Sequence, residues 1–310
     1  RDKRQWGLSM QPTITPLDAT LGASITDIDL ANLNEDTWAI VEDAFHEYAA
    51  LVFPEQNLTD EAQIAFANRF GDMEILRDDP NAKAVNITNQ KPDGSILQPD
   101  EHRYQALRGN EGWHTDSSYM PLAAKASILA ALTVPSAGGE TAVADMRAAY
   151  DDLDQDMKDR IEGLSAHHSL YQSQAKIGHI VETGAGYGYH DKGAPLRPLV
   201  NIHPVTGRKS LFIGRHAYSI PGMDDGEAQE LLDELLDFAC QPPRTYFHSW
   251  RPGDVFMWDN RCTLHAARPY DYGEARIMRH TRIAGDPVSE LVATGRDARA
   301  ADFVPSSTNR

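Results

Sequence analysis

The residues with the clearest potential for chemistry lie in the stretch WHTDSSY, residues 113–119, where a histidine and an aspartate are two positions apart. Residues two apart on an extended strand project from the same face, so His114 and Asp116 could bind one metal ion while Trp113 and Thr115 point away. Because the chain has 12 histidines and is rich in aspartate, about one pair of the form His-x-Asp is expected by chance. The pair alone therefore leaves both a metal site and an ordinary turn open.

A third candidate ligand is His265, in the stretch WDNRCTLHAARPYD, which follows a predicted strand and turn. Two histidines and one carboxylate on one face of an octahedral ion leave three positions open, which is typical of Fe(II) enzymes that activate oxygen. A structural zinc site is closed by four protein ligands, usually with cysteine, and Cys240 and Cys262 are not spaced as ligands. The sequence thus favours an iron site that keeps room for other ligands.

The segment ARIMRHTRI, residues 275–283, adds an independent constraint. If it is a strand, Arg276, His280 and Arg282 share one face, and Arg279 points to the other face, where we interpret it as a surface charge. A buried arginine beside an iron site requires an anion, because an unpaired buried charge is costly. A dicarboxylate co-substrate would satisfy it, since the planar guanidinium makes two parallel hydrogen bonds to a carboxylate.

The composition excludes several classes of function. The formal net charge of −17 and the pI near 5.0 argue against a nucleic-acid partner, because no excess of lysine and arginine exists to replace phosphate counterions. No apolar run approaches the length of a membrane span, and no secretory signal opens the chain. With only two cysteines, we expect a cytoplasmic protein. Residues 1–9 precede Met10 and are interpreted as a possible extension.

The hydropathy pattern predicts strands at both ends of the chain with helices between them. Strands are expected within 14–30 and at 51–54, 125–135, 244–250, 255–259 and 275–285, and helices at 36–50, 59–70, 145–163 and 224–239. Distant strands that meet around one core predict a β-rich α+β fold of barrel or sandwich type. We expect a single domain over residues 10–294, with 73–112 as a lid loop and 295–310 as a flexible tail.

Other histidines carry no matching partners in the sequence. His167 and His168 are adjacent and would face opposite ways on a strand, so we interpret them as structural or surface groups. His179, His190 and His203 lie in stretches rich in glycine and proline and are interpreted as solvated loop residues.

Taken in order, these motifs resemble the Fe(II)- and 2-oxoglutarate-dependent dioxygenases related to taurine dioxygenase and 2,4-dichlorophenoxyacetate dioxygenase. The resemblance rests on LGASITDIDL, WHTD, the GGET turn, WDNRCTLH and an arginine eleven residues after the second histidine, and it extends from about residue 12 to 286. Through HSLYQSQAKIGH, LFIGRHAYSIPGMD and RIMRHTRIAG, the chain looks most similar to the aryloxyalkanoate dioxygenases, particularly the type acting on (S)-phenoxypropionates.

The resemblance implies a jelly-roll core, a double-stranded β-helix with flanking helices. It also implies that the protein uses Fe(II), 2-oxoglutarate and O2. The site residues that it implies are three iron ligands, His114, Asp116 and His265; two residues for the distal carboxylate of 2-oxoglutarate, Arg276 and Thr141; and one residue near this co-substrate, Asn110.

One position departs from the family pattern. Many relatives carry a second arginine fifteen residues after the last histidine, near the bound carboxylates, whereas this chain has His280 there. We predict that Arg282 holds the substrate anion instead, because it shares the face of Arg276. Arg215 and His216, in IGRHAYSI, offer an alternative clamp.

The implied substrate is a small carboxylic acid, and we expect an aryloxyalkanoate. Hydroxylation of a carbon that carries the ether oxygen gives a hemiacetal, which collapses to a phenol and a keto acid, with succinate and CO2 as co-products. Trp113 and Tyr119 are candidates for packing the aromatic ring, although residues of this type more often belong to the core.

Other functions stay open at this stage. A sulfonate or an alkyl sulfate is an alternative substrate. From other classes, a catalytically silent metal-binding homologue and a metal-dependent hydrolase are alternatives, and Arg276 with Thr141 argues against the hydrolase, which needs no clamp for 2-oxoglutarate. A homodimer or homotrimer is possible, but no segment identifies an interface.

Overall fold

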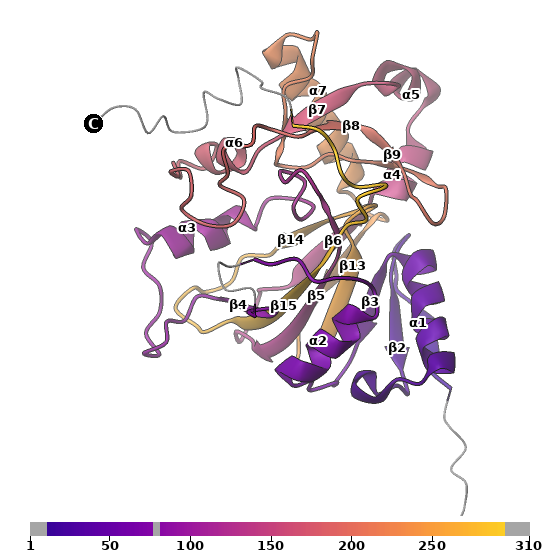
Figure 1. Cartoon of the computed structure of the whole chain (residues 1–310), viewed down its shortest axis with the longest axis vertical. Helices are drawn as coiled ribbons and strands as arrows, with labels where there is room; N and C mark the ends of the chain where they lie inside the picture. Colours follow the sequence, from indigo (N-terminus) through magenta and orange to yellow (C-terminus); the bar gives the residue numbers. More distant parts are fainter. Residues whose placement is uncertain (1–10, 77–80, 295–310) are drawn as a thin grey trace, which may run out of the picture.

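A seven-stranded sheet forms the centre of the chain (Figure 1). The computed structural model describes residues 11–76 and 81–294, so the expectations for residues 1–9 and 295–310 fall outside it. In spatial order, the strands of this sheet are β1 (Thr13–Pro16), β2 (Ala23–Thr26), β3 (Ala50–Phe53), β13 (Val255–Asp259), β5 (Ala124–Thr133), β15 (Ile277–Ala284) and β4 (Val85–Thr88). Strands from both ends of the chain therefore meet in one sheet, as the sequence predicts.

Smaller sheets accompany the large one within the described residues. A three-stranded sheet has the order β12 (Thr245–His248), β6 (Thr141–Asp145), β14 (Thr263–Ala267), and it is antiparallel throughout. A second has the order β11 (Ala217–Tyr218), β7 (Ser165–His168), β8 (Leu196–Pro198), and a two-stranded sheet pairs β10 (Lys209–Leu211) with β9 (Val200–Ile202).

Seven α-helices accompany the sheets in the described part of the chain. They are α1 (Glu35–Tyr48), α2 (Asp60–Asn68), α3 (His102–Gly109), α4 (Met146–Asp152), α5 (Gln155–Ile161), α6 (Leu170–Ala175) and α7 (Asp225–Ala239). The helix predicted over 145–163 is two helices, because Leu153 is extended and the Asp154 carboxylate caps a new helix by accepting from the Met157 amide at 2.8 Å.

Three apolar clusters show how the layers stack. α1 and α2 cover one face of the large sheet, where Phe45 and Phe66 belong to the same cluster as Ile128 of β5. The other face of that sheet packs against the β12-β6-β14 sheet, and this layer contains Phe256 and Val143. α4 and α7 cover the outer side of the β12-β6-β14 sheet. The described architecture is thus mixed α/β with its sheets at the centre, in agreement with a β-rich α+β fold.

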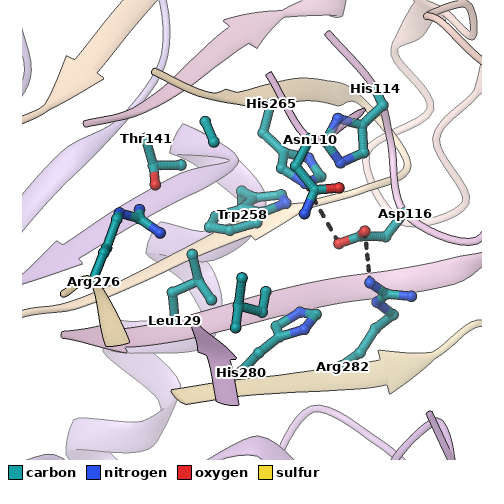
Figure 2. A pocket seen from close by; sticks show the side chains of 12 residues that line it. Asn110, His114, Asp116, Leu129, Thr141, Trp258, His265, Arg276, His280 and Arg282 are labelled. Carbon is teal, nitrogen blue, oxygen red and sulfur yellow. Dashed lines mark hydrogen bonds and ion pairs between the residues drawn. The ribbon is translucent and has the colours of Figure 1, made fainter. Parts of the chain in front are cut away.

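The pleat of the strands decides which side chains point between the two packed sheets. On β5, Ile128 faces the helices, so its neighbour Leu129 faces the opposite sheet. On β13, Trp258 faces inward by the same alternation. Leu129 and Trp258 line a cavity together with the polar residues of the candidate site described below (Figure 2).

The segment 73–112, predicted as a lid loop, contains two short regular elements, because β4 pairs with β15 and α3 follows; its role as a lid stays a prediction. The expectation for Arg279 is wrong, because it is not a surface charge. It is 4% exposed, because α2 packs over its face of β15, where its guanidinium forms an ion pair with Asp60 and donates to the Gln63 side chain at 2.7 Å.

No helix among residues 11–76 and 81–294 is both long and apolar enough to cross a membrane.

Candidate metal and co-substrate site

His114 and His265 are held side by side by their own backbones. The His114 amide donates to the His265 carbonyl at 2.9 Å, and the His265 amide donates to the His114 carbonyl at 2.7 Å, which makes an isolated antiparallel bridge. The two rings consequently have centroids 4.1 Å apart. His265 belongs to β14, so the pairing extends the β12-β6-β14 sheet to the WHTD segment. The spacing in the sequence could not reveal this pairing, which depends on the fold.

Asp116 completes the group. Its carboxylate and the two imidazoles offer ligand atoms that all lie within 4.8 Å of one another, and all three residues are buried. Figure 2 shows the three side chains converging on one point beside the cavity. The Asp116 Oδ2 atom accepts from Ser127 Oγ at 2.5 Å, and Asn260 donates to the same Ser127 oxygen at 3.0 Å. The carboxylate is therefore oriented by hydrogen bonds before any ion is present.

The protonation states of this group are those that a metal ion requires. Burial lowers the pKa of His114 to about 4, with a further lowering by the Arg215 charge, and burial lowers the pKa of His265 well below its usual range. Burial would raise the pKa of Asp116, but the Arg282 guanidinium holds it below its usual range. At neutral pH the group thus consists of two neutral imidazoles and one carboxylate.

The tautomer of His114 also suits a ligand. Its Nδ1 lies 2.7 Å from the Gly112 carbonyl oxygen, which can only accept, so Nδ1 carries the proton and Nε2 keeps its lone pair for an ion. The donor set of two imidazole nitrogens and one carboxylate matches the facial arrangement of non-haem Fe(II) sites. On this chemistry, the residues fit an Fe(II) ion.

A cavity of about 70 Å³ extends from this group toward Arg276 and Thr141. Arg276 is 6% exposed, and its guanidinium forms no ion pair with any described residue; Nε donates to the Gly139 carbonyl at 3.1 Å. The Thr141 Oγ1 atom accepts from Trp250 Nε1 at 3.1 Å, so its own proton is available to a ligand. Burial lowers the pKa of Arg276, which shows the cost of keeping this charge without an anion.

The GGET turn brings these two residues together. Gly138 and Gly139 have φ of +72° and +71°, a conformation that favours glycine. A Cβ at Gly138 would lie 2.5 Å from the Pro269 carbonyl oxygen, and one at Gly139 would lie 3.3 Å from the Arg276 side chain. The two glycines therefore allow the turn to pack against the segment that carries the arginine.

A second cavity, of about 280 Å³, opens beside the metal-ligand group. Both cavities are lined by Asn110, His114, Asp116 and Arg282, so two of the three candidate ligands border both, whereas His265 lines the first. The apolar and aromatic residues that line the second cavity are Ile87, Ala106, Leu107, Tyr119, Leu170, Tyr187 and Tyr189. Several come from the segment 73–112, which forms part of the wall.

Arg215 and His216 also line the second cavity. The Arg215 guanidinium donates to backbone carbonyls of Gly109 and Ser173 and to Gln174 Oε1 at 2.6 Å, and it forms no ion pair with any described carboxylate. Burial lowers the pKa of Arg215 to about 10. The His216 Nδ1 atom lies 2.8 Å from Ser173 Oγ. This cavity thus contains a positive charge that lacks an anion.

The remaining predicted residues divide between the site and the core. Tyr119 lines the second cavity and His280 lines the first. Trp113 lines neither cavity and packs against the apolar cluster between α7 and the β12-β6-β14 sheet. Arg282, predicted to hold the substrate anion, instead directs Nη2 to Asp116 Oδ1 at 2.7 Å. Its predicted role is not supported by its contacts.

Several residues of the site were missed by reasoning from the sequence. Ser127 and Asn260 orient Asp116. Glu74 forms an ion pair with Arg282 and accepts hydrogen bonds from Ser117 and Tyr187. Asn260 lies in the quoted WDNRCTLH motif, which was a usable signal. Glu74 and Tyr187 lie in segments without periodicity, and nothing in the sequence marks them.

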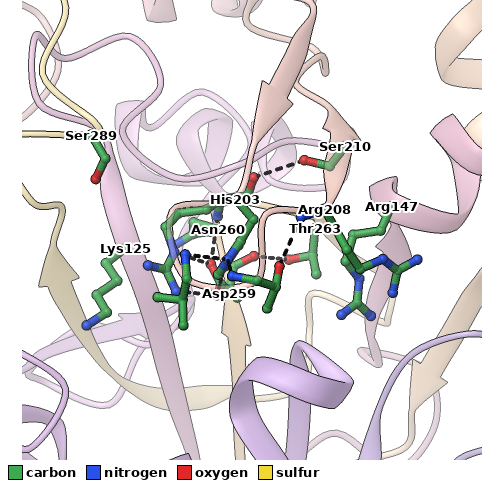
Figure 3. A network of polar contacts seen from close by, with 12 residues as sticks. Lys125, Arg147, His203, Arg208, Ser210, Asp259, Asn260, Thr263 and Ser289 are labelled. Carbon is green, nitrogen blue, oxygen red and sulfur yellow. Dashed lines mark hydrogen bonds and ion pairs between the residues drawn. The ribbon is translucent and has the colours of Figure 1, made fainter. Parts of the chain in front are cut away.

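A second group of histidines and a carboxylate, His46, His203 and Asp259, does not fit a metal ion. Figure 3 shows His203 and Asp259 within their polar network. His203 is 2% exposed rather than solvated, and its Nε2 donates to Asp259 at 3.0 Å while its Nδ1 accepts from backbone amides. Asp259 also accepts two hydrogen bonds from the Arg261 guanidinium, at 2.8 and 2.6 Å. No lone pair of His203 remains for an ion, and the arginine would repel one.

Comparison with known proteins defines the class. Residues 13–282 match the family model of the taurine catabolism dioxygenase TauD, TfdA family. The chain is 54% identical to the (S)-phenoxypropionate/alpha-ketoglutarate-dioxygenase of Sphingobium herbicidovorans, over 89% of this chain and 96% of that protein. It is 46% identical to the protein of the same description from Delftia acidovorans, over 92% of this chain and 99% of that one.

A solved structure agrees. The crystal structure of AAD-2 in complex with Mn(II) and N-oxalylglycine superposes with a TM-score of 0.84 at 38% identity, over 92% of this chain and all of the other. The chain therefore belongs to the TauD, TfdA dioxygenase family.

Proposed function

We propose that the protein is an Fe(II)- and 2-oxoglutarate-dependent dioxygenase that cleaves an aryloxyalkanoate at its ether bond. The observation that carries this proposal is the arrangement of the two cavities: one leads from the metal-ligand group to an unpaired buried arginine, and the other is wide and lined by aromatic residues. The relatives named for (S)-phenoxypropionate support the substrate class.

His114, Asp116 and His265 would hold the iron. When bound, Fe(II) with 2-oxoglutarate supplies the oxidation of a substrate C–H bond by O2, which also yields succinate and CO2. The protein contributes fixed geometry, because the backbone bridge between the histidines and the Ser127 hydrogen bond to Asp116 set the ligand positions in advance.

Arg276 and Thr141 would bind the distal carboxylate of 2-oxoglutarate. The guanidinium and the threonine hydroxyl together offer the donors that a carboxylate accepts, in a place that is nearly closed to solvent. Asn110 would lie beside the bound molecule, since it lines both cavities.

Arg215 would neutralise the carboxylate of the substrate. Two other arginines line the second cavity: Arg282 already pairs with Asp116, and Arg103 is exposed to solvent. Arg215 is partly buried and has no described carboxylate partner. The apolar and aromatic wall that includes Leu170 and Tyr189 would pack the aryl ring. An acid with an aromatic ring thus matches the cavity in both charge and polarity.

The two packed sheets also lead to a proposal about the fold. We infer that the large sheet and the β12-β6-β14 sheet are the two halves of a double-stranded β-helix, which is supported by the apolar layer between them and by the likeness to AAD-2. Assembly as a dimer or trimer stays a prediction.

The test is succinate formation by the Fe(II)-loaded protein, given 2-oxoglutarate and O2, with a panel of aryloxyalkanoates, sulfonates and alkyl sulfates. We expect succinate and a phenol in equal amounts with one or more aryloxyalkanoates. Succinate that rises only with a sulfonate or an alkyl sulfate would refute the aryloxyalkanoate. Turnover without succinate, or no turnover with any acid, would refute the dioxygenase.

Arg215→Met tests the substrate clamp. We expect the KM for the aryloxyalkanoate to rise about 10- to 150-fold, the range for loss of a charge-assisted hydrogen bond, with little change for 2-oxoglutarate. Arg268→Met is the matched control, since Arg268 is partly exposed and stacks on Phe247 outside both cavities. Equal increases in the KM of both substrates would contradict the assignment.

A further inference from the structure

Arg282 occupies the centre of a polar network beside the metal-ligand group. Its Nη2 donates to Asp116 Oδ1 at 2.7 Å and its Nη1 donates to Ser117 Oγ at 3.0 Å, while its Nε lies 3.8 Å from Glu74 Oε2. Both terminal nitrogens are thus hydrogen-bonded within the protein, while Nε makes only the longer ion-pair contact with Glu74. The residue is only 8% exposed, so solvent hardly competes for these contacts.

Glu74 and Tyr187 reach this network from two separate segments of the chain. The Tyr187 hydroxyl donates to Glu74 Oε1, and the Ser117 hydroxyl donates to Glu74 Oε2 at 2.9 Å. The Glu74 amide donates to the Arg282 carbonyl at 2.8 Å, which fixes the position of Glu74 beside β15. The Tyr187 ring also lies with its centroid 5.8 Å from the Arg282 guanidinium carbon.

The charges explain why these groups belong together. One guanidinium lies between two carboxylates, Asp116 and Glu74, in a nearly dry environment. Glu74 would be costly to bury alone, and its two hydroxyl donors and Arg282 stabilise it. Arg282 is in turn kept in one place, with Nη2 at Asp116. An arginine held in this way has no free fork for a substrate carboxylate.

Ser117 directly follows the candidate ligand Asp116, and its hydroxyl is hydrogen-bonded to Glu74 and Arg282. Its φ is +57°, in the left-handed region that a serine rarely adopts, and its side chain is fully buried. Its hydroxyl lies within hydrogen-bond distance of Arg282, Glu74 and Tyr187. These three contacts hold the turn that begins directly after the candidate ligand.

We propose that Arg282 is a positioning residue for the metal ligand Asp116, and that Glu74 and Tyr187 act through Arg282 to fix that carboxylate. The proposal rests on the proposed function in one respect, since it takes Asp116 as a ligand. Tyr187 also lines the second cavity, so the wall of the substrate cavity is joined to the metal ligand by a short series of polar contacts.

Metal affinity is the property that this arrangement controls. Loss of a partner that orients a metal ligand weakens metal binding about 10- to 100-fold. We expect this loss for Arg282→Lys, because a lysine keeps the charge but cannot contact Asp116, Ser117 and Glu74 at once. For Tyr187→Phe, which removes one hydrogen bond two steps away, we expect a weakening of about 2- to 12-fold.

The experiment measures the dissociation constant of Fe(II) by anaerobic competition with a chromophoric chelator, without any organic substrate. Wild type, Arg282→Lys, Tyr187→Phe and the double variant are compared. If Tyr187 acts through Arg282, the double variant binds Fe(II) no more weakly than Arg282→Lys alone. Tyr171→Phe is the matched control. It removes a hydroxyl bonded to Thr183 and the His190 carbonyl, away from Glu74, and is expected to leave Fe(II) affinity unchanged.

A second measurement separates positioning from a substrate clamp. At saturating Fe(II), Arg282→Lys is expected to leave the KM for the aryloxyalkanoate nearly unchanged, whereas a clamp would show a raised KM and normal Fe(II) affinity. The latter result, or additive effects in the double variant, would overturn the proposal. A wild-type protein that binds Fe(II) with the expected variant effects but forms no succinate would refute the proposed function alone. Failure of the wild type to bind any divalent metal would overturn both.

Discussion

Arg276→Met is expected to separate co-substrate binding from stability. Arg276 is buried without a described carboxylate partner, so its charge costs free energy until an anion binds. The substitution removes a charge-assisted pair worth about 1.5 to 3 kcal/mol, so the KM for 2-oxoglutarate should rise about 10- to 150-fold. Since methionine removes an unpaired charge, the melting temperature of the metal-free and ligand-free protein should not fall.

Thermal unfolding with and without 2-oxoglutarate measures the free energy of unfolding that the bound co-substrate adds. At a ligand concentration 100 times the dissociation constant, wild type with metal bound gains about 2.7 kcal/mol from the co-substrate. A variant that binds 100-fold more weakly gains only about 0.4 kcal/mol at the same concentration. The assay is therefore a comparison of the two melting curves, together with steady-state kinetics in 2-oxoglutarate.

The matched control, Arg279, lies on β15, which begins directly after Arg276. Arg279→Met leaves Gln63 and the Leu58 carbonyl without a buried donor, and should destabilise the protein by about 1 to 3 kcal/mol with no change in the KM for 2-oxoglutarate. A lower melting temperature for Arg276→Met with normal 2-oxoglutarate kinetics would mean that Arg276 is structural. That result would refute the reasoning from its missing partner.

Three further predictions concern metal binding, pH and the glycine turn. Alanine at His114, Asp116 or His265 should abolish succinate formation and lower the bound iron measured after gel filtration; near-normal turnover in any of them would remove that residue from the ligand set. Burial lowers the pKa of His280 to about 3, below the value near 6.5 of an unfolded histidine, so its contribution to stability is present above pH 6.5 and is lost as the pH falls toward 3. His280→Asn should therefore reduce the slope of unfolding free energy between pH 6 and 4 by about 1.4 kcal/mol per pH unit, as measured by denaturant titration of the metal-free protein, and an unchanged slope would show that His280 is charged when folded. Gly138→Ala places a Cβ 2.5 Å from a backbone oxygen at a φ of +72°, and should lower stability by about 1 to 3 kcal/mol while raising the KM for 2-oxoglutarate; a fully stable variant would contradict the close approach.

Much of the candidate site could be predicted from residue type and spacing. The separation of two between His114 and Asp116 is a local property of extended chain, and so is the shared face of Arg276, His280 and Arg282. The pattern of apolar residues also predicted the central strands and most helices. These features depend on period and side-chain chemistry, which any single sequence displays.

Only the tertiary structure decided which arginines are paired within the protein and which are not. Arg279 is buried because α2 lies over it, and Arg282 is bound to Asp116 because Glu74 and Tyr187 arrive from distant segments. Arg215 has no carboxylate partner within the described residues, because the elements packed around it bring only carbonyl and amide oxygens to its guanidinium. A sequence shows that a side chain is charged, but the partner of a buried charge is set by the elements packed around it, and these meet only when the chain folds.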